Sequence, residues 1–189
     1  MGKSNKYTDI NYKNLRTGDI VICGGRGPLA FVIKWATAGF KNRHRKAYST
    51  HTGVVIEVYG QKLVAEMLGT EGGIRINSLE NYLNDKNRFI LDIKRFPKMD
   101  DADRDVIAKQ IAYDVRKCLE YDYKGLVEFV FSKVDDNKDK NYCSEYVYKL
   151  MDSLDKFFTD KQKSKFDKKM SPEDWRKLES LIPVDWEVK

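Results

Sequence analysis

The sequence contains no long hydrophobic run and few of the residues from which disulfide frameworks or metal sites are built. Its 189 residues include three cysteines, two histidines and four prolines. The longest apolar stretch, residues 28–40, is interrupted by Lys34, so no segment has the roughly 18 apolar residues of a membrane-spanning helix. The first ten residues, MGKSNKYTDI, lack the apolar centre of a secretory signal peptide. We therefore expect a cytoplasmic protein.

The three cysteines also bear on the kind of site the chain can form. They are odd in number and widely spaced, which does not fit a disulfide framework and is simplest in a reducing compartment. The spacing of the cysteines and histidines fits no zinc site. The sequence therefore predicts no zinc site.

The composition is that of a charged globular domain. Hydrophobic residues make up 41% of the chain and charged residues 34%, and the net charge is 35 − 29 = +6. The length favours a single domain over residues 1–189, with residues 1–14 as a poorly ordered extension. Acidic residues are interspersed almost everywhere except in the basic run 41–46. We therefore expect no specific nucleic-acid partner, although residues 41–46 are a candidate contact with a membrane surface.

The periodicity of apolar residues changes between the two halves of the chain. Alternating, β-branched segments dominate the first half, whereas helical spacing dominates the second. The predicted strands cover residues 19–23, 51–58, 62–68 and 88–96, and the predicted helices cover residues 28–39, 100–120 and 141–158, with another starting at Ser171. This order predicts an α+β fold in which an antiparallel sheet or small barrel packs against helices.

The three cysteines have different predicted surroundings. Cys23 ends a buried strand and Cys118 lies on the apolar stripe of the helix 100–120, so both are expected to pack in the core. Cys143 lies at the start of a helix that Asn141 is expected to cap. Free N–H groups and the helix dipole favour a thiolate at such a position. From these residues alone, Cys143 can be either a core-packing residue or a reactive thiol.

The predicted hairpin 51–58/62–68 brings a possible base and carboxylate onto one face. Because residues opposite one another have numbers that sum to 119 or 121, Glu66 shares a sheet face with His51. The two residues are offset along the strand, so their contact is expected to need a bulge or a strong twist. A thiol, an imidazole and a third polar group can carry out acyl transfer, with the Cys143 N–H stabilising the oxyanion.

Six segments together resemble a known family of hydrolases. They are LRTGDIVI, STHTGVVIEV, VAEM, YDY, NYCSEYV and SPEDW, spread over about residues 15–175. They are similar to the YiiX-like branch of the papain-like NlpC superfamily, which consists of circularly permuted cysteine hydrolases. The resemblance implies a papain-like α+β fold, with Cys143 as nucleophile, His51 as base and Glu66 as orienting residue. It also implies that Tyr121 lines the substrate site and that no metal or organic cofactor is needed.

The expected activity is hydrolysis of an amide bond through a thioester acyl-enzyme intermediate. The substrate would be a small peptide or amide, such as a cell-wall peptide. One alternative is a lipid-directed acyl hydrolase or acyltransferase on the same scaffold, in which residues 41–46 would meet a membrane surface. Another alternative is a binding module without catalytic activity.

Overall fold

The structure is a computed structural model that describes residues 12–38, 48–69, 72–80, 88–121, 140–166 and 170–186. In chain order its elements are η1 (Tyr12–Asn14), β1 (Ile20–Gly25), α1 (Pro28–Ala38), β2 (His51–Val58), β3 (Gln61–Leu68), β4 (Gly73–Ser78), β5 (Arg88–Arg95), α3 (Asp101–Arg116), β6 (Glu120–Tyr121), β7 (Lys140–Asn141), α5 (Cys143–Asp152), α6 (Asp160–Phe166), α7 (Pro172–Lys177) and β8 (Ile182–Pro183).

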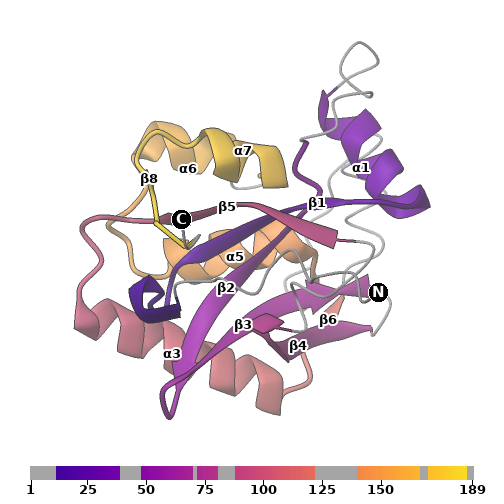
Figure 1. The fold of residues 1–189 in the computed structure, drawn as a ribbon. Helices are drawn as coiled ribbons and strands as arrows, with labels where there is room; N and C mark the ends of the chain where they lie inside the picture. The colour runs from indigo at the N-terminus through magenta and orange to yellow at the C-terminus, as the bar shows by residue number, and fades with distance from the viewer. Residues whose placement is uncertain are drawn as a thin grey trace.

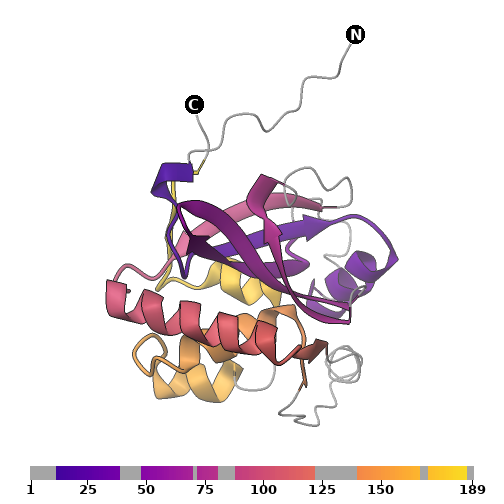
Figure 2. The ribbon, with the colours of Figure 1, turned by 90° about the horizontal axis from the view of Figure 1, so that it is seen from below.

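The eight strands of the described residues form one sheet in the order β7-β6-β4-β3-β2-β1-β5-β8 (Figure 1). Neighbouring strands are antiparallel, apart from the short parallel pair β6 and β7 at one edge. Helices α3 and α5 lie on the same side of the sheet (Figures 1 and 2). The predicted α+β class is therefore confirmed.

The sheet buries apolar side chains on both faces. Along β1, Ile20 and Ile22 point toward the helices, whereas Val21 and Cys23 point to the opposite face, as expected from the two-residue repeat of a strand. The cluster on the helix side includes Ile107, Tyr146, Val147, Leu150, Met151 and Trp175. The cluster on the other side includes Leu15, Val55, Val64, Leu79, Ile93 and Val184. Cys23 is fully buried, which confirms its predicted packing role.

The hairpin β2–β3 turns through two residues. Tyr59 and Gly60 both have positive φ, at 48° and 79°, which is the conformation of a type I′ turn and matches the twist of the flanking strands. This turn fixes the register, so that Gly53 lies opposite Glu66. The predicted parity of the hairpin is confirmed, with opposite residues summing to 119.

The helix that carries Cys143 is shorter than predicted. Helix α5 starts at Cys143 with Tyr142 at its N-cap, so the expectation that Asn141 caps it is wrong. Instead, the Glu145 carboxylate accepts a hydrogen bond from the Tyr142 N–H at 3.4 Å. The helix ends at Asp152, before a turn in which Asp155 has a φ of 50°.

The expectation that Cys118 is buried is also wrong. Helix α3 ends at Arg116, two residues earlier than Cys118. Cys118 follows with a φ of 52° and is exposed, because the helical stripe no longer sets its direction. Ile107 and Ile111 are buried as predicted, but Val106 on the same predicted stripe is 47% exposed.

Several predictions concern residues outside the described part of the chain. They are residues 1–11 of the extension predicted over residues 1–14 and the basic run 41–46. The last three residues of that extension, Tyr12–Asn14, form η1, so the prediction of poor order is wrong for them. The single-domain organisation likewise stays a prediction. Within the residues that the structure describes, no helix combines the length and the apolar character needed to cross a membrane.

Candidate active site

His51 and Glu66 meet at the end of the β2–β3 hairpin that lies away from its turn. His51 is the first residue of β2 and Glu66 lies near the end of β3. The His51 Nε2 and Glu66 Oε2 atoms are 2.6 Å apart, so the predicted partnership is confirmed. Of the bulge or strong twist expected to bring them together, a bulge is not present where β2 and β3 pair, since their register is regular from Gly53 to Val58. Gly53, directly opposite Glu66, has no side chain, which leaves room for Glu66 to reach His51 on the diagonal.

Glu66 is almost completely buried and is held by three neighbouring side chains. Besides His51, Asn77 Nδ2 donates to Glu66 Oε1 at 2.7 Å and Arg88 Nη1 donates to Glu66 Oε2 at 2.6 Å. Burial opposes ionisation, but the hydrogen bond and charge of His51, together with Arg88 and Asn77, lower the pKa of Glu66 below its usual value. Glu66 is therefore a carboxylate.

Neither Asn77 nor Arg88 was identified from the sequence. Asn77 lies opposite Val64 on the neighbouring strand, so it shares the face of Glu66, and parity could have found it once β4 was placed. Arg88 comes from β5, which is separated from β3 by two strands in the sheet. The contact between Arg88 and Glu66 depends on how strongly the sheet coils, and no short-range sequence pattern predicts the degree of coiling.

Cys143 lies against the other side of the His51 ring. Its side chain is buried, with 3% exposure for the residue, and the His51 side chain is 14% exposed. The two groups are hydrogen-bonded. Because Glu66 occupies Nε2, the Nδ1 atom is the ring nitrogen left to exchange a proton with the thiol.

The surroundings of Cys143 and His51 favour an ion pair between them. Burial opposes the ionisation of Cys143, but the charge and hydrogen bond of His51, with the backbone amides of Thr52 and Ser144, lower its pKa. Burial likewise opposes protonation of His51, but Cys143 and Glu66 together raise its pKa to about 9. Both shifts favour a thiolate–imidazolium pair over the neutral thiol and imidazole.

Helix α7 contacts the segments that carry both Cys143 and His51. Glu173 Oε2 accepts hydrogen bonds from the Ser49 N–H and hydroxyl, at 3.1 and 2.8 Å. Trp175 Nε1 donates to the Ser144 carbonyl at 3.3 Å. Ser171 caps the helix, with Pro172 in its first turn, as the sequence predicts. Neither Glu173 nor Trp175 was identified from the sequence, because their partners are distant in the chain.

Tyr121, the predicted substrate-binding residue, is described only by its backbone. It pairs in parallel with Asn141, two residues before Cys143. Its side chain lies outside the described part of the structure, so its role stays a prediction.

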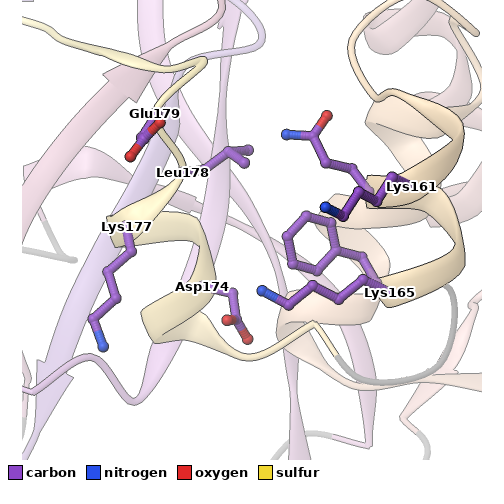
Figure 3. A pocket seen from close by; sticks show the side chains of 8 residues that line it. Lys161, Lys165, Asp174, Lys177, Leu178 and Glu179 are labelled. Carbon is purple, nitrogen blue, oxygen red and sulfur yellow. The ribbon is translucent and has the colours of Figure 1, made fainter.

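The residues that the structure describes contain no candidate metal-binding cluster. Within this part of the chain, no group of three or more His, Cys, Asp or Glu side chains could hold a metal ion. A cavity of about 350 Å³ lies between α6 and α7 (Figure 3). Neither Cys143, His51 nor Glu66 lines it, so it is separate from these residues.

Comparison with known proteins identifies the fold. No model of a known protein family matches the sequence, and no curated protein matches it. A crystal structure of metalloprotein yiiX from Escherichia coli O157:H7 is similar, with a TM-score of 0.62 and 18% sequence identity. The match covers 93% of this chain and 99% of that one. The chain therefore has the YiiX-like fold that its sequence motifs predicted.

Proposed function

We propose that this chain, with its YiiX-like fold, is a cysteine hydrolase that cleaves amide bonds with a permuted papain-like arrangement of catalytic residues. One observation carries the proposal: His51 contacts the Cys143 thiol on one side and the Glu66 carboxylate on the other. The strand that carries His51 precedes the helix that carries Cys143 in the chain. This order is the reverse of that in papain, as a circular permutation would produce. Cys143 is the nucleophile, His51 the acid and base, and Glu66 the orienting residue.

In the acylation step, the Cys143 thiolate attacks the carbonyl carbon of the amide. The new carbon–sulfur bond pushes the carbonyl electrons onto oxygen, and the Cys143 N–H at the start of α5 stabilises that oxyanion. The His51 imidazolium then donates its proton to the amide nitrogen. The carbon–nitrogen bond breaks, the amine leaves, and a thioester on Cys143 remains.

Deacylation reverses the roles of the same groups. Neutral His51 takes a proton from a water molecule, and the resulting hydroxide attacks the thioester carbon. The carboxylic acid leaves, and the Cys143 thiolate and His51 imidazolium are restored. Glu66 keeps its charge throughout, because it holds Nε2 of His51 and stabilises the imidazolium.

The similar protein is called a metalloprotein, but the described residues of this chain do not fit a metal ion. Both Glu66 oxygens already accept hydrogen bonds from side chains, and one of these donors is the Arg88 cation. Cys143 and His51 would provide only two ligands, fewer than a structural or catalytic zinc requires. We therefore derive no step through a metal.

The pH dependence of thiol alkylation tests the proposed nucleophile, and the chain contains its own control. Cys118 is an exposed thiol outside the site, and Cys23 is buried in the core. We expect iodoacetamide to modify Cys143 at pH 5 to 6 faster than it modifies the exposed Cys118. Peptide mapping by mass spectrometry assigns each adduct. Equal pH dependence of Cys143 and Cys118 would contradict an activated thiol.

The hydrolase activity needs a separate measurement. We expect acyl p-nitroanilides to release p-nitroaniline with the native chain and not with Cys143→Ala. Rapid acid quenching should trap an acyl group on Cys143, seen as a mass increase that hydroxylamine removes. If a broad set of acyl groups gives turnover that Cys143→Ala retains, the assigned nucleophile is wrong.

A further inference from the structure

A groove that the proposed catalysis does not use lies along helix α6. Its first part, of about 350 Å³, lies between α6 and α7 (Figure 3). Its second part, of about 660 Å³, lies beside the turn after β5. Gln162 and Glu179 line both parts, so the two adjoin. Each volume falls within the range of ordinary ligand sites.

Apolar side chains line much of the groove. Phe166 and Leu178 line the first part, and Phe96, Phe157 and Ile182 line the second. Ile182 is 47% exposed. A ligand with an apolar side chain could remove this surface from water, which favours binding in proportion to the area covered.

Lysines without a carboxylate partner border the same groove. Lys161 and Lys165 project from α6 toward α7 (Figure 3), and Lys98 borders the second part. Among the residues that the structure describes, none of these three forms an ion pair. The nearby carboxylate of Asp174 is already used, because it accepts hydrogen bonds from the Ser171 N–H and hydroxyl. Glu179, which lines both parts, likewise forms no ion pair among the described residues. The three unpaired lysines therefore outnumber this one carboxylate, and the groove presents net positive charge beside apolar surface.

The spacing of the two α6 lysines matches an extended peptide. Residues four apart in a helix are separated by about 6 Å along the axis. Alternate residues of an extended strand are separated by about 6.6 Å. A Glu-x-Glu segment lying along α6 therefore brings one carboxylate to Lys161 and the next to Lys165. The middle residue then faces the opposite wall, where Leu178 lies.

We propose that this groove binds an extended acidic peptide in which a hydrophobic residue lies between two carboxylates. The partner is a polypeptide segment of this chemistry, held by Lys161 and Lys165 on one side and by apolar contact on the other. The proposal does not depend on the catalytic chemistry, since no catalytic residue lines the groove.

Fluorescence anisotropy with a labelled Glu-Leu-Glu peptide flanked by glycines tests the proposal. We expect saturable binding to the native chain, and roughly tenfold or greater loss in Lys161→Glu/Lys165→Glu, where two attractions become repulsions. Lys13→Glu/Lys109→Glu is the matched control, because it changes the net charge equally at exposed residues outside the groove. Cys143→Ala should bind the peptide like the native chain.

A second pair of probes tests the apolar contact without altering the protein. A Glu-Ser-Glu peptide should bind several-fold more weakly than Glu-Leu-Glu. Equal affinity for the two, or equal loss in both double variants, would mean unspecific charge attraction and would overturn the proposal. So would the absence of binding, or displacement of the peptide by vesicles of anionic lipid at the same two lysines, which would indicate a membrane contact.

Discussion

Replacing Glu66 by glutamine tests how far the proposed active site depends on one buried charge. Glu66→Gln preserves the size of the side chain but removes the negative charge that contacts His51 and Arg88, each at 2.6 Å. An amide N–H at this position can also donate to Nε2 of His51. The proton would then reside on Nδ1, and that tautomer cannot accept a proton from Cys143.

The size of the effect follows from the hydrogen bond that is lost. A hydrogen bond to a charged group contributes about 1.5–3 kcal/mol, and a change of one pKa unit corresponds to about 1.36 kcal/mol. We therefore expect the pKa of His51 to fall by about 1–2 units from its value of about 9, and the pKa of Cys143 to rise because its cationic partner is weakened. The pH range over which the Cys143–His51 ion pair exists then becomes narrower at its acidic and at its basic limit. At a pH below the pKa of Cys143, its alkylation should slow by roughly 10- to 100-fold.

The assay is the rate of Cys143 alkylation as a function of pH, with Cys118 as the internal reference. Glu57→Gln is the matched control, because Glu57 is exposed on the same hairpin and pairs with Lys62. Its profile should coincide with that of the native chain. If Cys143 of Glu66→Gln is alkylated at acidic pH as fast as in the native chain, the argument that the Glu66 carboxylate stabilises the ion pair is refuted.

Three further substitutions have defined outcomes. Cys143→Ala should leave the far-ultraviolet circular dichroism spectrum unchanged and shift Tm by only a few degrees, since it removes one small buried group. Gly25→Ala would place a Cβ 2.7 Å from Thr50 Oγ1, and Thr50 directly precedes the strand that begins with His51. Denaturant unfolding should therefore show that the free energy of unfolding falls by about 1–3 kcal/mol. Cys143 alkylation should also slow. Tyr146→Phe removes the hydroxyl that donates to Asp114 at 3.2 Å, and urea titration should show a loss of about 1–2 kcal/mol; no loss would mean that this contact does not contribute to stability.

The sequence predicted those parts of the fold and site that depend on local pattern. A two-residue turn fixes the pairing of β2 with β3, so parity alone placed Glu66 on the face of His51. Ser171 and Pro172 likewise determine where α7 begins. Cys143 at a helix start followed from the same kind of reasoning, although Tyr142 and not Asn141 occupies the N-cap.

The parts that the sequence did not predict depend on tertiary packing. Cys118 follows the end of α3 in a left-handed conformation, and helix periodicity carries no information past that end. The contacts of Arg88 with Glu66 and of Glu173 with Ser49 join residues from distant parts of the chain. Such contacts arise from the coiling of the sheet and the docking of α7, which a periodic pattern does not encode.

The position of α7 has a consequence for the order in which the protein matures. During synthesis, the hairpin that bears His51 emerges first, the cysteine helix emerges much later, and Glu173 and Trp175 emerge later still. Until α7 docks, nothing from this helix ties Ser49 to Ser144. The contacts through which α7 holds the histidine and cysteine segments therefore form last, after the carboxy-terminal helix has been synthesised.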